Sequence, residues 1–126
     1  MHFPEHLRYT KDHLWINVIE DYALIGITLF AQMELGGVAF VNCKKIGKHC
    51  AQGKVFGTIE AVKAVSDMFL PVSGVIQELN PLLRNEPGLI NKDPYEKGWI
   101  VKLKADNAGD IQGLFTAAEY EKFING

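Results

Sequence analysis

Apolar and polar positions alternate over several short stretches of this chain, a pattern that favours β-strands over helices. The clearest example is the segment 14–19, which is followed by a turn at Glu20-Asp21 and an apolar return over 22–27. This order predicts a hairpin. Further short strands are expected at 38–41, 55–61, 65–70, 75–79 and 99–103.

Helices are expected only at a few places, each marked by capping residues. Thr28 is a suitable N-cap for a short helix over 29–35, and Gly36-Gly37 would end it. Asn80-Pro81 predicts a helical turn through Arg84. At the C-terminal end, Thr116-Ala-Ala-Glu119 fits a capping box and opens a final helix. The segment 85–94 contains Pro87-Gly88 and Asp93-Pro94, which interrupt regular structure, so it is expected to be a loop.

Many short strands with closely spaced turns predict a mainly β fold, a small sandwich or barrel with helices at its edges. The 126 residues suit one domain, 1–126, and the hydrophobic share of 48% is enough for a core. The net charge of −2 gives no reason to expect nucleic acid or a membrane as partner. The large aromatic residues are predicted to be core: Trp15, Phe40, Phe56, Phe69 and Trp99.

Motifs that would indicate catalysis are missing. The sequence has no dinucleotide-binding glycine pattern, no phosphate-binding loop and no Gly-x-Ser-x-Gly elbow. Cys43, His49 and Cys50 could approach one metal ion, but zinc normally needs four ligands. We therefore predict no catalytic residue, no metal and no enzymatic activity. A redox or metal function of the two cysteines remains an alternative, which replacing both with serine would test.

The most informative segment is 59–67, where Lys63 is expected at the tip of a hairpin. By itself such a lysine is most simply a solvated surface charge. Small apolar neighbours on both sides would let its amine project from the body as the root of a swinging arm. The residues expected to touch such an arm, or to be recognised by a modifying enzyme, are Glu60, Val62, Ala64, Ser66 and Asp67.

The segment from Glu60 to Asp67 closely resembles the lipoylation segment of glycine cleavage system H proteins. The resemblance covers essentially the whole chain. Other matching stretches are Leu7-Arg8-Tyr9-Thr10, His13-Leu14-Trp15, Gly26-Ile27-Thr28, Ala31-Gln32, Leu35-Gly36, Pro71-Val72-Ser73-Gly74, Leu89-Ile90-Asn91, Asp93-Pro94-Tyr95 and Gly98-Trp99.

The resemblance implies a barrel-sandwich hybrid, the flattened β-barrel of two antiparallel sheets found in lipoyl and biotinyl carriers, with a C-terminal helix. It implies lipoate bound covalently to Lys63 by a lipoate ligase or octanoyltransferase. The carrier would take an aminomethyl group from glycine decarboxylase to aminomethyltransferase, and its dithiol to dihydrolipoamide dehydrogenase. The chain is then a carrier protein of glycine catabolism and one-carbon metabolism, expected in the bacterial cytoplasm because no transit peptide precedes it.

The chain departs from the family pattern at several usually acidic positions, which here are Leu14, Leu29, Gly37 and Asn42. The following loop carries Lys44, Lys45 and Lys48 where the family tends to be acidic. One interpretation is neutral surface variation. The other is a divergent lipoyl carrier or lipoyl-relay protein that serves a different enzyme system, since interface charge sets partner choice.

A biotinyl carrier of the same architecture is a further alternative. Biotin acceptor lysines are usually flanked by methionines, whereas Val62 and Ala64 flank Lys63 here. The flanking residues therefore argue against biotin, and the mass of the attached group would decide.

Overall fold

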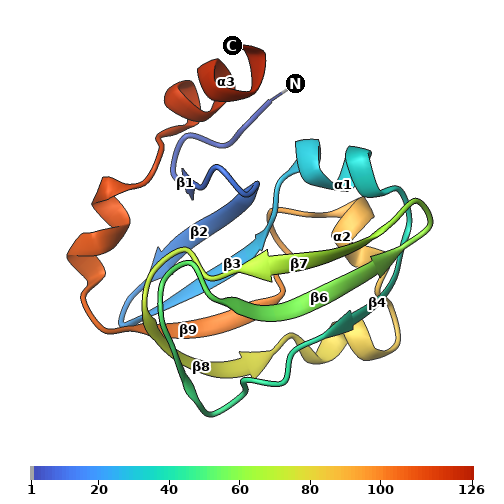
Figure 1. Cartoon of the computed structure of the whole chain (residues 1–126), viewed down its shortest axis with the longest axis horizontal. Helices are drawn as coiled ribbons and strands as arrows, with labels where there is room; N and C mark the ends of the chain where they lie inside the picture. Colours follow the sequence, from blue (N-terminus) through green and yellow to red (C-terminus); the bar gives the residue numbers. More distant parts are fainter. Residues whose placement is uncertain (1) are drawn as a thin grey trace.

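The computed structural model describes residues 2–126, which form short strands, three α-helices and two 3-10 turns (Figure 1). The strands are β1 (Arg8–Tyr9), β2 (Leu14–Ile19), β3 (Tyr22–Ile27), β4 (Val38–Asn42), β5 (His49–Cys50), β6 (Val55–Ala61), β7 (Val65–Phe69), β8 (Gly74–Leu79) and β9 (Val101–Ala105). The helices are α1 (Leu29–Leu35), α2 (Leu89–Lys92) and α3 (Ala117–Asn125), with 3-10 turns η1 (Pro81–Arg84) and η2 (Ala108–Gly113).

The strands form two antiparallel sheets that face each other across a shared core (Figure 1). One sheet has the order β1-β2-β3-β9-β8-β5, and the other has the order β4-β6-β7. Residues from both sheets, such as Ile25 and Leu103 on one side and Phe56 and Ile59 on the other, belong to one buried cluster. Two small sheets that bury one face each make a flattened barrel, so the predicted mainly β barrel-sandwich fold is confirmed.

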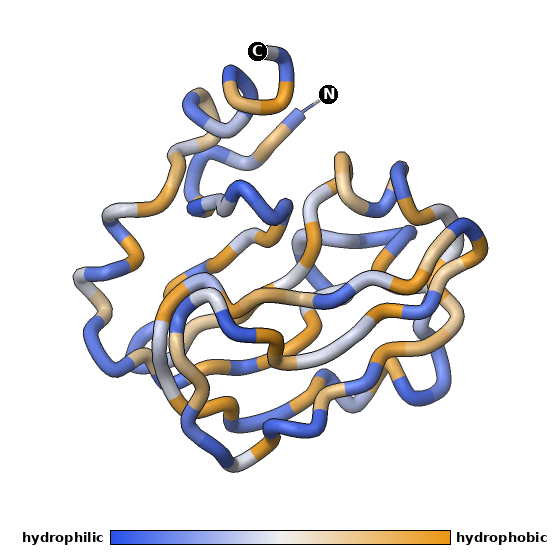
Figure 2. The backbone as a smooth tube through the Cα atoms, in the orientation of Figure 1, coloured by the Kyte–Doolittle hydropathy of each residue, from blue (hydrophilic) through white to orange (hydrophobic). Residues whose placement is uncertain are grey.

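The hydropathy of the backbone alternates along the strands, with apolar and polar residues in close succession (Figure 2). This alternation puts one face of each sheet in the core and the other in solvent. Trp15 and Phe56 are buried as predicted, and Phe69 and Trp99 are half-buried. The prediction for Phe40 is wrong: its side chain is 53% exposed. It lies on the outer face of β4, where a register shift between Val38 and Phe40 interrupts the alternation.

A second, smaller cluster joins the N-terminal segment to α3. The rings of Tyr9 and Tyr120 stack with 4.9 Å between their centroids, and both side chains are fully buried. At the start of α3 the predicted capping box is present. The side chains of Thr116 and Glu119 each accept a hydrogen bond from the backbone N–H of the other residue. The helix is thereby fixed at its first turn and along one face.

Two other sequence predictions need correction, and three short elements were missed. The segment 85–94 is not all loop, because it contains α2, and the last strand begins at Val101 instead of residue 99. The short elements β1, β5 and η2 were not predicted, since two-residue strands and 3-10 turns have too little periodicity to be recognised. Within residues 2–126, no helix has both the length and the apolar character needed to cross a bilayer.

Candidate functional site: the tip of the β6–β7 hairpin

Lys63 lies at the tip of the tight hairpin that joins β6 to β7. Glu60 pairs with Val65, and the N–H of Ala61 donates to the carbonyl of Ala64 at 2.9 Å. The pairing therefore continues up to the turn, and Val62 and Lys63 occupy the two positions beyond it. The Lys63 side chain is exposed. Within residues 2–126 its ammonium group forms no ion pair.

The tip is attached to the C-terminal end of α1 by hydrogen bonds. The N–H of Val62 donates to the carbonyl of Gly37 at 2.9 Å, and the N–H of Lys63 donates to that of Leu35 at 3.0 Å. The Lys63 Nζ atom also donates to the Met33 carbonyl at 3.3 Å. The last carbonyls of a helix have no partner within the helix, so the hairpin satisfies groups that α1 leaves free. The amine is thus exposed, yet it bends back over α1 and does not project away from the body as expected.

Gly36 ends α1 with φ +79, a backbone conformation that glycine adopts without strain. A Cβ atom at this position would lie 3.4 Å from Cγ of Lys63, so the stem of the lysine runs directly over Gly36. The side chain of Asn91 supports this corner from α2. Its Nδ2 donates to the Gly36 carbonyl at 3.0 Å, and its Oδ1 accepts from Val38 N at 2.9 Å. Sequence analysis did not assign this supporting role, because Asn91 is far from the tip in the chain.

Several exposed apolar side chains lie on the elements next to the tip. Val62 is 82% exposed and Val65 is 67% exposed. Phe40, Glu60 and Val65 are directly paired across β4, β6 and β7, so they share the outer face of the sheet. We call the four exposed apolar residues next to the tip the apolar collar: Met33, Phe40, Val62 and Val65. Apolar side chains that gather at one exposed place are typical of an interaction surface.

The remaining predicted site residues lie close to the tip but point in different directions. Glu60 and Asp67 are exposed on the outer face, where Asp67 pairs with Thr58. Ser66 is half-buried, and its hydroxyl donates to the Asp67 carbonyl at 3.3 Å. Ala64 is exposed beside Lys63. An arm rooted at the lysine could therefore meet the carboxylates of the outer face.

The positions that depart from the family pattern differ in their surroundings. Leu14 is 1% exposed and belongs to the main core, where it pairs with Ile27. Leu29 is half-buried, and its N–H donates to the Tyr95 hydroxyl at 2.9 Å. Gly37 contacts the tip through its carbonyl. Asn42 is half-buried opposite Thr58 and leads into the lysine-containing loop.

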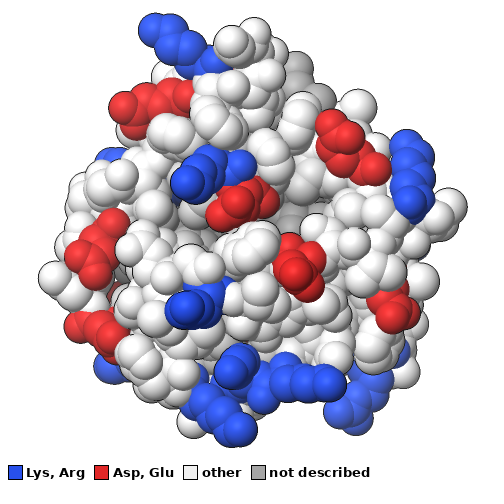
Figure 3. All heavy atoms as spheres, in the orientation of Figure 1, with Lys and Arg blue, Asp and Glu red and all other residues white. Residues whose placement is uncertain are grey.

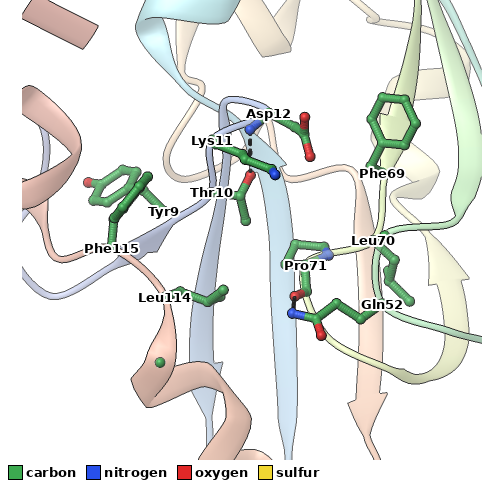
Figure 4. A pocket seen from close by; sticks show the side chains of 12 residues that line it. Tyr9, Thr10, Lys11, Asp12, Gln52, Phe69, Leu70, Pro71, Leu114 and Phe115 are labelled. Atoms are coloured by element: carbon green, nitrogen blue, oxygen red, sulfur yellow. Dashed lines mark hydrogen bonds between the residues drawn. The ribbon is translucent and has the colours of Figure 1, made fainter. Parts of the chain in front are cut away.

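A cavity of about 440 Å³ opens at the opposite end of β7 from the lysine (Figure 4). Its walls come from the β1–β2 connection, the end of β7 and the segment before α3. In Figure 4 Lys11 and Asp12 stand between the rings of Phe115 and Phe69. The lining holds one ammonium and one carboxylate but no histidine or cysteine.

Among residues 2–126, the two cysteines do not belong to a group of metal ligands. Cys50 is buried and Cys43 half-buried, and burial raises the pKa of the Cys43 thiol. His49 is instead bound to Asp106, with 2.7 Å between Nε2 and Oδ2. In the part of the chain that the structure describes, no three His, Cys, Asp or Glu residues are grouped as metal ligands.

Comparison with known proteins identifies the family. The profile of the family described as Glycine cleavage H-protein matches residues 7–126. The glycine cleavage system H protein of Bacteroides fragilis is 46% identical over 125 residues, with 99% of each chain covered. That of Chlorobaculum tepidum is 49% identical over 126 residues, with 98% of each chain covered. The chain belongs to the glycine cleavage H-protein family. Its relation to known H proteins extends over nearly the full length of both chains, so the resemblance predicted from sequence is confirmed.

The fold agrees with this assignment. The crystal structure of the H protein from Mycobacterium marinum superposes with a TM-score of 0.89 at 32% identity. The superposition covers 98% of this chain and 100% of the Mycobacterium marinum chain. As an H-protein family member, the chain has a part in the glycine cleavage system as a carrier component.

Proposed function

We propose that Lys63 carries lipoate through an amide bond and that the protein transfers the aminomethyl group between the enzymes of glycine cleavage. The observation that supports this most directly is an exposed lysine amine, free of carboxylate partners within residues 2–126, on a tip fixed by three hydrogen bonds. Such an amine is accessible to an acylating enzyme, and its root stays in one place afterwards.

The residues at the tip fit an acylated lysine. An amide nitrogen keeps one hydrogen, so it can still donate to the Met33 carbonyl that the free amine contacts at 3.3 Å. Acylation removes the positive charge, and no carboxylate of residues 2–126 loses an ion pair with Lys63 as a result. Lipoate would supply a disulfide that accepts the aminomethyl group and electrons. The chain itself would hold the root and present it.

The apolar collar supports repeated docking to other proteins. Phe40 and Val65 lie on either side of Glu60 on the outer face, within reach of any channel that receives the arm. A partner that covers them excludes water around the arm and gains the free energy of apolar burial. The proposed partners are glycine decarboxylase, aminomethyltransferase and dihydrolipoamide dehydrogenase, with a lipoate ligase or octanoyltransferase that modifies Lys63. The place of action that we propose is the bacterial cytoplasm.

A divergent lipoyl carrier for another enzyme system is the second candidate. The observations that favour it are Leu14, which puts an apolar side chain in the core at a usually acidic position, and the lysine-rich loop after Asn42. Incubation of lipoylated protein with glycine, glycine decarboxylase and its pyridoxal phosphate distinguishes the two. Carbon dioxide release that depends on the carrier supports the first candidate, and its absence supports the second.

Intact mass tests the attachment. We expect expression with a lipoate ligase to add about 188 Da to the wild type, whereas a biotinyl group would add about 226 Da. Lys63→Arg should remain unmodified, because a guanidinium is not acylated by this chemistry, and it keeps a similar side-chain length. Lys54→Arg, in the turn before β6, is the matched control and should be modified like the wild type. An unchanged wild-type mass, or full modification of Lys63→Arg, would refute the proposal.

A further inference from the structure

A second surface feature lies between β4 and β5, where the chain forms an exposed turn. Residues 44–48, Lys-Lys-Ile-Gly-Lys, are all exposed, and Ile46 exposes 40% of its side chain between the lysines. We call these residues the basic turn. Three positive charges within five positions contrast with the net charge of −2 of the whole chain.

Backbone hydrogen bonds hold the basic turn in one shape. The N–H of Lys48 donates to the carbonyl of Lys45 at 2.9 Å, which closes the turn. Gly47 donates to the carbonyl of Ile76 on β8 at 2.6 Å, and Ile76 donates back to the Lys48 carbonyl at 3.1 Å. The lysines are therefore presented from a fixed backbone, so a partner that binds them has little main-chain entropy to remove.

Within residues 2–126, no ion pair neutralises the charge of the basic turn. Of the described residues, no carboxylate forms an ion pair with Lys44, Lys45 or Lys48. The neighbouring His49 is the one that pairs with Asp106. Figure 3 shows Lys and Arg side chains along the lower edge of the molecule, where the chain after β4 runs in Figure 1, with no acidic side chain among them.

We propose that the basic turn binds to an acidic surface of an enzyme whose active site receives the Lys63 arm. Ile46 would fill an apolar pocket on that surface. This rests on the proposed carrier function. Nucleic acid is a poorer match, because the chain as a whole is acidic and the basic turn has no aromatic side chain for stacking on bases. A protein surface matches both the charges and the exposed isoleucine, since interfaces combine apolar contact with charge complementarity.

The place of the basic turn favours an anchor over a second contact at the arm. In Figure 1 the tip of the β6–β7 hairpin lies at the right-hand edge of the molecule, whereas the chain after β4 runs along the lower edge. Strand β4 starts beside the tip, where Val38 pairs with Ala61, and leads away from it to Asn42, about 13 Å over four steps of 3.3 Å per residue. A partner could hold the basic turn while the arm moves freely, which raises the local concentration of the arm at its active site.

Charge reversal tests the anchor. Lys44→Glu, Lys45→Glu and Lys48→Glu together change the net charge from −2 to −8. The matched control, Lys92→Glu, Lys97→Glu and Lys122→Glu, makes the same change at exposed lysines elsewhere. Dissociation constants of both variants and the wild type are measured for purified glycine decarboxylase, aminomethyltransferase and dihydrolipoamide dehydrogenase at about 50 and 300 mM salt. Thermal unfolding confirms that the variants are folded.

We expect the basic-turn variant to bind at least one of the three enzymes about tenfold more weakly at low salt, and the control less than about threefold. The difference should shrink at high salt because the charges are exposed. Ile46→Ser should weaken binding to the same enzyme at both salt concentrations. Equal binding by wild type and basic-turn variant to all three enzymes overturns the proposal, as does an equal loss in the control. So does wild-type binding to none of them.

A labelled single-stranded oligonucleotide serves as the competing partner. Binding of the oligonucleotide that only the basic-turn variant loses, with unchanged enzyme binding, would also refute the anchor. Intact mass is read in the same samples. A lipoylated protein without charge-dependent binding refutes the anchor alone, whereas an unlipoylated protein refutes the proposed function and the binding comparison still tests the anchor.

Discussion

The Nζ atom of Lys63 lies 3.3 Å from the carbonyl oxygen of Met33, to which it donates a hydrogen bond. This contact joins two parts of the chain that are 30 positions apart. Since the backbone N–H of Lys63 also donates to Leu35, both ends of the residue are held by the last turn of α1. The orientation of the arm's root therefore depends on the helix end as well as on the hairpin.

Gly36→Ala should disturb this arrangement through the helix end. Gly36 has φ +79 and ψ −157, a conformation that residues other than glycine rarely adopt, so an alanine there costs about 1–3 kcal/mol of strain. Relief of that strain would move the carbonyls of Met33 and Leu35, and with them the root of Lys63. We expect the rate of lipoylation by a lipoate ligase to fall several-fold, to about a third or less, measured by intact mass over time.

Gly47→Ala is the control, because Gly47 has φ +80 and nothing within 4 Å of an added Cβ. It should lose a similar amount of stability while its lipoylation rate stays at the wild-type value. Equal lipoylation rates in the two variants would show that the helix end does not position the lysine.

Phe40→Ser should weaken docking without weakening the fold. Its side chain is 53% exposed, so removing it leaves no cavity, while a partner that covers the apolar collar loses the apolar area. We expect the KM of glycine decarboxylase for the lipoylated carrier to rise about three- to tenfold. Val18→Ser, at a side chain 47% exposed on β2, is the matched control and should leave KM unchanged. Equal effects of both substitutions would contradict a role of the apolar collar.

The elements that sequence predicted are those whose signals are local. The β2–β3 hairpin, α1 with its Thr28 cap and Gly36 end, and the capping box of α3 each depend on residues a few positions apart. The same holds for the position of Lys63 at a hairpin tip, which follows from strand periodicity on both sides. The resemblance to a family added the chemistry, which periodicity alone does not contain.

What sequence missed depends on tertiary contacts. The bend of Lys63 onto α1 and the support by Asn91 join segments that only the folded chain brings together. Phe40 is of a residue type that is usually buried, but the register shift in β4 turns its side chain outward. The exposure of Phe40 in the apolar collar follows from this register shift, so no local pattern could have indicated it.

Gly26→Ala should destabilise the protein by crowding Trp15. A Cβ atom at Gly26 would lie 2.6 Å from the Cε2 atom of the Trp15 ring. The ring cannot easily move, because it is 1% exposed and its Nε1 donates to the Pro94 carbonyl at 3.0 Å. We expect a loss of about 1–3 kcal/mol in urea unfolding. Gly113→Ala, where an added Cβ meets nothing within 4 Å, should change the unfolding midpoint little. Equal midpoints for both variants would contradict the tight contact.

His13 should make the attachment of α3 sensitive to pH. Its Nδ1 lies 2.8 Å from the hydroxyl of Tyr120, which in turn lies 2.8 Å from Oγ1 of Thr28. Burial lowers the pKa of His13 below its usual value of about 6.5, and the nearby carboxylates of Asp12 and Glu34 only partly oppose this. Burial also raises the pKa of Tyr120 to about 12, so the tyrosine stays protonated throughout this range.

The sign of the effect follows from proton binding. Because the pKa of His13 is lower in the folded protein than in the unfolded chain, the unfolded chain binds more protons between the two values. The stability that neutral His13 contributes is therefore fully present above the pKa that His13 has in the unfolded chain. It is lost as the pH falls below that value. His13 has φ 70, which asparagine tolerates better than most residues, so His13→Asn removes the titration with little backbone strain.

We expect the free energy of unfolding of the wild type to fall, relative to His13→Asn, between about pH 7.5 and pH 5.5. Urea unfolding at several pH values measures this difference, in which titrations common to both proteins cancel. The rings of Phe30 and Phe123 also pack against His13, so NMR signals of α3 should shift over the same range in the wild type. Parallel stability curves for the two proteins would show that the protonation of His13 is not coupled to folding.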